Sequence, residues 1–310
     1  MKFYQTNDFF ADSPSVVALG CFDGVHLGHA AVIRKAVLGA KLMGVKSAVW
    51  CFEEPPRNFF AKNSVPVLTA PDQKRALIEA LGIDILACVR FDTEIGSLSP
   101  SDFFEEILIK RMRAAGVVCG FNYSFGKGGS GNTELLSELC KKNGIGFTCV
   151  PPVLLDGTAV SSSAIRTAIS DGDMKKANGL LGRHYSITSA VIDGNQIGRK
   201  LGFPTANISL DGAALILKRG VYVTRTSFDG KSYFGITNVG THPTVSQSEV
   251  LAETNLFDFS GDLYGKTITL EFIDFLREEK KFPSLDDLSA QVRRDIEKAR
   301  IFIYENYLSK

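Results

Sequence analysis

The chain has 310 residues, with 35 basic and 34 acidic side chains and a formal net charge of +1. Its length predicts two domains, because domains commonly contain about 100 to 200 residues. The balanced charge excludes a global attraction to nucleic acid or to an anionic membrane, so any anion site must be local. The sequence contains neither an apolar run long enough for a membrane span nor a signal-peptide core, so we expect a cytoplasmic protein without a membrane or nucleic-acid partner.

The six cysteines all lie before residue 150, mostly in apolar segments, and none forms a CxxC pair. This spacing favours reduced, buried thiols over a disulfide framework or a zinc site. They are Cys21, Cys51, Cys88, Cys119, Cys140 and Cys149.

From residue 15 to about 153, short apolar runs alternate with longer amphipathic segments, which predicts an α/β, doubly wound, Rossmann-like domain. A capping box with proline at the first helical position begins at Ser99. We expect strands at 15–19, 46–52, 85–91, 116–119 and 146–151, and helices at 29–43, 71–81, 161–169 and 173–181. The predicted domains are 1–182 and 183–310.

A glycine-rich segment, residues 20–29, follows the first expected strand and leads into the first long helix. This is the place where a parallel sheet presents a phosphate to a helix N-terminus. His26 and His29 are three residues apart, so both imidazoles can face one way and donate to phosphate oxygens. Such donors favour a transition state in which negative charge builds on phosphorus. Glycines 20, 24 and 28 allow the backbone to approach the phosphate closely.

This segment resembles the HxGH motif of the nucleotidyltransferase superfamily, and its longer form, GxFDGVHxGH, is similar to that of bacterial FAD synthetases. Residues 52–57, 120–126 and 161–166 also resemble that family, in segments usually read as FEPHPR, a flavin and nucleotide loop, and SSTxIR. Pro55 replaces the histidine of the first and Ser163 the threonine of the last. The resemblance implies ATP contacts from Gly20, Phe22, Asp23, Gly24, Gly28, Ser162, Ser163 and Arg166, and flavin contacts from Arg57, Asn122 and Phe125.

Two further segments carry side chains that could contact phosphate. Ser162 and Ser163 open a helix and place Arg166 on the same face, where its guanidinium can clamp a phosphate. An N-cap with a solvated arginine is the alternative. The run 126–131 is glycine-rich and includes Lys127, but it is not a Walker A motif because no Ser or Thr follows the lysine. We interpret it as at most a mobile lid.

Past residue 182, period-two alternation between turn signals predicts an antiparallel barrel or sandwich. Strands are expected at 185–192, 220–228, 233–239 and 266–275, with a turn at Asp229-Gly230. A capping box at Ser284 opens a terminal helix that should pack on the sheet. Its expected apolar stripe is Leu285, Leu288, Val292, Ile296, Ala299 and Ile303.

Residues 198–208 resemble the GRxLGxPTANI motif of riboflavin kinases, which implies a barrel domain. Thr205 and Asn207 alternate in an extended segment, so their side-chain oxygens face one way and suit Mg²⁺ carrying ATP. The resemblance implies ATP or phosphate contacts from Gly198, Lys200, Gly202, Pro204, Thr205 and Asn207.

A kinase also needs a group that accepts the proton of the alcohol. Glu253 is the candidate because its surroundings resemble the family segment LEVHLFDF, although Thr254 and Asn255 stand where Val and His are usual. Residues 238–244 resemble NxGxRPT, with His242 in place of arginine, which removes a permanent charge.

These resemblances imply a bifunctional enzyme that makes FMN from riboflavin and ATP in its C-terminal half and FAD from FMN and ATP in its N-terminal half. Two alternatives remain at this point. The first is an HxGH nucleotidyltransferase of another substrate class, such as a cytidylyltransferase, fused to an unrelated barrel. The second is a flavin-binding sensor that has lost turnover. The sequence leaves the oligomeric state open.

Overall fold

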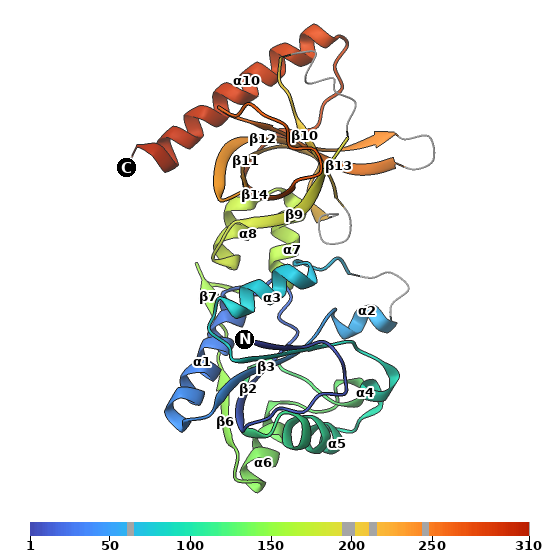
Figure 1. The fold of residues 1–310 in the computed structure, drawn as a ribbon, viewed down its shortest axis with the longest axis vertical. Coiled ribbons are helices and arrows are strands. Elements are labelled where there is room, and N and C mark those ends of the chain that lie inside the picture. Colours follow the sequence, from blue (N-terminus) through green and yellow to red (C-terminus); the bar gives the residue numbers. More distant parts are fainter. Residues whose placement is uncertain (61–64, 194–201, 211–215, 244–247, 310) are drawn as a thin grey trace. The chain divides into compact units, whose positions relative to one another are not determined.

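The computed structural model describes residues 1–309 except 61–64, 194–201, 211–215 and 244–247. The chain divides into two compact units, Met1–Ser162 and Ser163–Lys310 (Figure 1). We describe each unit by itself. The domain boundary after residue 182 stays a prediction.

The first unit is built on a six-stranded sheet in which every neighbouring pair is parallel. The strand order is β1-β4-β3-β2-β5-β6, so the chain winds outward in both directions from β2. An open sheet of this kind binds ligands at the carboxyl ends of its strands, where the winding direction changes. That point lies just after β2, where the segment 20–29 begins.

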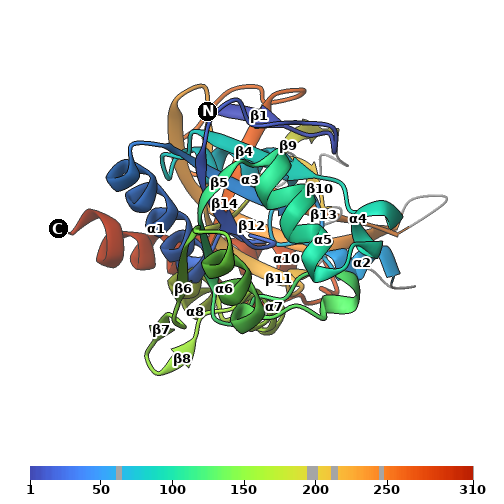
Figure 2. The same cartoon turned by 90° about the horizontal axis from the view of Figure 1, so that it is seen from below.

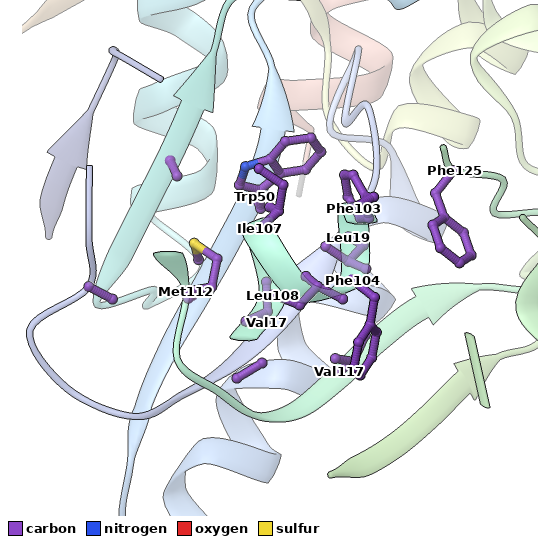
Figure 3. Packing of buried hydrophobic residues seen from close by; sticks show 14 of the residues in the cluster. Val17, Leu19, Trp50, Phe103, Phe104, Ile107, Leu108, Met112, Val117 and Phe125 are labelled. Carbon is purple, nitrogen blue, oxygen red and sulfur yellow. The ribbon is translucent and has the colours of Figure 1, made fainter. Parts of the chain in front are cut away.

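Helices cover both faces of the sheet (Figure 2), which explains why its strands are continuous apolar runs. Helices α1 and α3 supply residues such as Ile33 and Ile78 to the core on one face. The other face packs Trp50 against Phe103 and Ile107 of the α5–η1 segment (Figure 3). The strands are β1 (Lys2–Tyr4), β2 (Ser15–Leu19), β3 (Lys46–Phe52), β4 (Ile85–Val89), β5 (Ala114–Gly120) and β6 (Gly146–Val150). The helices are α1 (Leu27–Met43), α2 (Pro56–Phe60), α3 (Pro71–Glu79), α4 (Thr93–Ser97), α5 (Pro100–Phe103), the π-helix η1 (Phe104–Arg111), the 3₁₀ turn η2 (Lys127–Gly129) and α6 (Thr133–Lys142), and a small hairpin joins β7 (Leu154–Leu155) to β8 (Thr158–Ala159).

The five expected strands of this half and both long helices are confirmed, with ends that differ by no more than two residues. Ser99 caps α5 by accepting a hydrogen bond from the Asp102 backbone N–H at 3.1 Å. The sequence did not reveal β1, which pairs with β4 at one edge of the sheet. The expectation of buried cysteines is wrong for Cys149, which is exposed because it lies on the edge strand β6, and Cys21 is only half-buried.

The second unit is a closed antiparallel barrel, in the order β10-β13-β12-β11-β14-β9, which confirms the barrel and excludes the sandwich. Asp229 and Gly230 both have positive φ, 49° and 72°, as a tight two-residue hairpin between β11 and β12 requires. The elements are α7 (Ser162–Asp171), α8 (Met174–Leu181), β9 (Tyr185–Ile192), β10 (Ala206–Ser209), β11 (Gly220–Phe228), β12 (Lys231–Pro243), β13 (Ser248–Leu256), β14 (Thr267–Glu278), α10 (Leu285–Ile303) and the π-helical end η4 (Tyr304–Leu308).

The terminal helix α10 packs on the barrel through Ala299 and Ile303, as expected, with Val292 and Ile296 partly buried beside them. The expectation for Leu285 is wrong, because its side chain is 60% exposed in the first helical turn, before the packed part of the helix begins. Asp295 is instead 2% exposed and pairs with Arg277 of β14 at 2.8 Å. A buried carboxylate on the packed face was not foreseen from the apolar spacing.

Removing the buried partner of this ion pair should destabilise the second unit strongly. Asp295→Ala leaves the half-buried Arg277 guanidinium without its carboxylate, which typically costs about 3–5 kcal/mol. As a control, Asp258→Asn weakens an exposed ion pair with Arg300, which should cost less than about 1 kcal/mol. Urea unfolding followed by circular dichroism measures the loss of stability in both variants. Equal midpoints for the two variants would contradict a stabilising role of the buried pair.

Candidate functional sites

The loop between β2 and α1 adopts an unusual backbone. Phe22 and Val25 have φ values of 53° and 38°, and Gly24 lies between them at 87°. Residues other than glycine rarely adopt positive φ, and such strain persists only where surrounding contacts impose it. The strain coincides with the segment in which the sequence predicts phosphate contacts.

The histidine pair lies at the N-terminus of α1. His26 is the N-cap residue, and its Nδ1 accepts a hydrogen bond from the His29 backbone N–H at 3.2 Å. The two rings stack with their centroids 3.5 Å apart and their planes 16° apart. Since Nδ1 of His26 is an acceptor, the proton of the neutral ring lies on Nε2. The expected arrangement, in which both imidazoles face one way, is therefore present.

Other predicted residues of this site have different surroundings. The hydroxyl of Ser162, the last residue of the first unit, donates to the Asp23 carbonyl at 2.9 Å and so contacts the loop 20–29. The Asp23 carboxylate accepts from the Leu68 backbone N–H at 2.7 Å. Ser163 and Arg166 belong to α7 in the second unit, and their contacts with ATP stay predictions.

The three residues predicted to contact flavin differ in their exposure. Arg57 and Asn122 are exposed, whereas Phe125 is 5% exposed and belongs to the hydrophobic core. Its ring stacks on Tyr123, and burial raises the pKa of the Tyr123 phenol. The glycine-rich run begins against α5, since a side chain at Gly126 would come within 2.8 Å of the Pro100 nitrogen.

The barrel carries a cavity of about 420 Å³ beside the predicted magnesium residues. Its lining combines the PTAN segment with the turn that follows β13. The lining residues are Val191, Pro204, Thr205, Ala206, Asn207, Leu256, Phe259, Ser260, Gly261, Asp262, Leu263 and Tyr264.

Strand register brings Glu253 beside the PTAN motif. Asn207 of β10 pairs directly with Glu253 of β13, which in turn pairs with Asn238 of β12. Directly paired residues of antiparallel strands point to the same face, so the three polar side chains form one row. Asn207 is 3% exposed, and its Oδ1 has no hydrogen-bond partner among the residues that the structure describes. A buried, unpaired amide oxygen in a cavity wall is suited to a ligand that supplies positive charge.

Asn255, which departs from the family pattern, has a defined contact. Its amide donates to the Pro204 carbonyl at 2.9 Å and so ties β13 to the PTAN segment. Gly202 precedes the motif with a φ of 84°. Gly198 and Lys200 lie outside the described residues, and for His242 only the backbone, in β12, is described.

Two different family models match the N-terminal and the C-terminal half of the chain. A family model described as FAD synthetase matches residues 10–164, and one described as riboflavin kinase matches residues 181–303. A bifunctional riboflavin kinase/FMN adenylyltransferase of Bacillus subtilis is 36% identical over 92% of this chain and 91% of its own length. One of Listeria monocytogenes is 36% identical over 96% and 95% of the two chains. The chain belongs to the bifunctional riboflavin kinase/FMN adenylyltransferase family.

Membership of this family decides the first of the two alternatives left open by the sequence. The chain phosphorylates riboflavin to FMN with its C-terminal domain and adenylylates FMN to FAD with its N-terminal domain. An unrelated barrel fused to another nucleotidyltransferase is excluded, because the match to riboflavin kinases covers the barrel itself.

A solved structure from Streptococcus pneumoniae titled macrolide-efflux protein has the same architecture. Its TM-score is 0.85, with 34% identity over 94% of this chain and 96% of that one. Among the helices that the structure describes, none is long and apolar enough to cross a membrane.

A methyl group at Gly28 should disturb the histidine pair. The added Cβ of Gly28→Ala would lie 3.1 Å from Cε1 and 3.2 Å from Nδ1 of His26, so the His26 ring, which stacks on His29, must shift to make room. We expect FAD formation to fall by about tenfold or more, because small misplacements of catalytic groups are costly. Gly39→Ala, on the same helix with its nearest contact at 3.5 Å, should keep full activity. Rates of FAD formation from supplied FMN test this, and an unchanged rate for Gly28→Ala would contradict it.

Proposed function

We propose that the loop 20–29 holds the ATP phosphates during adenylyl transfer. The stacked pair of His26 and His29 at the N-terminus of α1 is the observation that carries this proposal. The phosphate oxygen of FMN attacks the α-phosphorus of ATP, the bond to the β-phosphate oxygen breaks, and pyrophosphate leaves. Imidazole N–H groups and the helix N-terminus stabilise the charge that builds on the transferred group. The FMN phosphate is already ionised, so this step needs no strong base.

We further propose that Glu253 acts as the base of the riboflavin kinase. Its carboxylate would accept the proton of the terminal ribityl hydroxyl while that oxygen attacks the γ-phosphorus of ATP and ADP leaves. The supporting observation is the direct pairing of Glu253 with Asn207, which lines the cavity.

The residues around Asn207 fit a magnesium ion. The buried Oδ1 of Asn207, which no described residue hydrogen-bonds, and the hydroxyl of Thr205 are neutral oxygen ligands of the kind that Mg²⁺ accepts when ATP phosphates supply the negative charge. When bound, the ion would neutralise charge on the phosphates. Within the described residues no cluster of three or more His, Cys, Asp or Glu side chains could hold a metal. The absence of nucleic-acid and membrane partners and the cytoplasmic location stay predictions.

Separate substitutions should separate the two reactions. His29→Ala should lower FAD formation from FMN by about 100-fold, because it removes one donor to the transition state. The same variant should convert riboflavin to FMN at the parent rate. Glu253→Ala should do the reverse, lowering FMN formation by about 100-fold or more.

Chromatographic separation of FMN and FAD, with either riboflavin or FMN supplied, measures both rates. Glu297→Ala, an exposed glutamate on α10, serves as the control for Glu253→Ala. If one substitution abolished both activities in a folded protein, the proposal of two independent sites would be wrong.

Changing Asn207 should alter the magnesium requirement of the kinase alone. For Asn207→Ala we expect the Mg²⁺ concentration for half-maximal kinase activity to rise by about tenfold, the equivalent of losing about 1.4 kcal/mol of binding free energy. Asn207→Asp keeps an oxygen at this position and should retain more activity. Magnesium titrations of FMN formation test this, and FAD formation from supplied FMN by the same protein is the control. An unchanged magnesium dependence would refute the assignment.

A further inference from the structure

One fully buried cation lies next to the predicted phosphate loop. Lys74 of α3 is 2% exposed, and its ammonium donates to the carbonyls of Phe52 at 2.8 Å and Glu53 at 2.9 Å, at the carboxyl end of β3. The carbonyl of Cys21 lies 3.5 Å from the same nitrogen. The ammonium therefore links the end of one central strand to the first residues of the loop that follows another.

The residues just before α3 hold the next positions of the same loop. The backbone N–H of Leu68 donates to the Asp23 carboxylate at 2.7 Å, and Thr69 Oγ1 accepts from the Gly24 backbone N–H at 3.2 Å. The three contacts therefore hold residues 21, 23 and 24, which flank the strained Phe22. We call these three contacts the 68–74 clamp.

The chemistry of Lys74 is unusual for a residue that only fills space. It lies on the packed side of α3, four residues from the fully buried Ile78, where an apolar side chain would serve for packing. A buried charge is costly, and apolar replacement of buried ionic groups is often neutral or stabilising. Burial works against the charge, yet the pKa of Lys74 is raised, because neighbours that include Cys51 and Asp23 favour the ammonium.

We propose that Lys74 and Thr69 are positioning residues for FMN adenylylation. Together they hold residues 21–25 in the strained conformation that presents the following histidines and backbone N–H groups to the ATP phosphates. The ammonium also places a fixed positive charge beneath the carboxyl edge of the sheet, where anionic ligands of this fold bind. This inference rests on the proposed role of the loop 20–29 in adenylyl transfer.

Lys74→Met tests the clamp in the full-length protein, because methionine keeps the length of the side chain and removes the charge. Lys35→Met, on the exposed face of α1, is the matched control. We expect kcat for FAD formation to fall by about tenfold or more in Lys74→Met, because a displaced loop no longer aligns the reacting groups. The KM for ATP should change less than kcat. Kinase activity of the same protein and of Lys35→Met should stay at the parent level.

The fluorescence of Trp50 reports separately on folding. This residue is the one tryptophan of the sequence and is buried in β3, two residues before Phe52. Native emission together with parent-like kcat in Lys74→Met would overturn the proposal. If the emission shows that this variant is unfolded, Thr69→Val decides, because it removes one contact with little change in volume. A threefold or larger loss of kcat would then support the clamp, and an unchanged kcat would refute it.

The role of the loop 20–29 and the role of the 68–74 clamp can be refuted separately. Retained FAD formation in His29→Ala would refute the role of the loop itself. Retained FAD formation in a folded Lys74→Met protein, together with an inactive His29→Ala protein, would refute the clamp alone.

Discussion

The strained turn between β2 and α1 is the constraint on which the proposed adenylylation site depends. Non-glycine residues at positive φ typically cost about 1–3 kcal/mol each, and Phe22 and Val25 both adopt such values. Relaxation of these residues would change the direction in which α1 starts and would move His26 away from His29. Contacts from distant parts of the chain oppose it, including the Ser162 hydroxyl on the Asp23 carbonyl. The site is therefore made by tertiary contacts as much as by its motif.

The proposed kinase site depends on a different constraint, the register of the barrel. Asn207, Glu253 and Asn238 share one face because β10, β13 and β12 pair in a fixed alignment. A shift of one residue would turn Glu253 toward the other face and replace it with Ala252 or Thr254. Both of those side chains are fully buried, which opposes such a shift. The two proposed sites thus depend on a strained loop in one unit and on a strand register in the other.

Much of the fold followed from the sequence because its periodicities are strong. The apolar run 15–19, the capping box at Ser99 and the turn at Asp229 each depend on neighbouring residues, and each is confirmed. The strand β13 was not predicted as a strand, since its polar residues, Glu253 among them, mask the alternation. Cys149 was misjudged because the sequence does not reveal which strand forms the edge of the sheet.

The candidate sites were predictable as motifs but not as geometry. The spacing of His26 and His29 predicted a common direction, whereas the positive φ of Phe22 has no local signal. Lys74 had a weak local signal, because it is a lysine on the apolar side of the helix 71–81. Its hydrogen-bond partners, however, lie 21 to 53 residues away along the chain. Contacts over such separations follow from the assembled sheet and not from local spacing.

A crystal structure of the full-length protein with Mg²⁺ and a non-hydrolysable ATP analogue would test the central claim most directly. The account predicts that the phosphates in the first unit lie within hydrogen-bond distance of His26 and His29, with Phe22 and Val25 still at positive φ. An analogue bound away from this loop, or a loop that relaxes to negative φ when it binds, would contradict it.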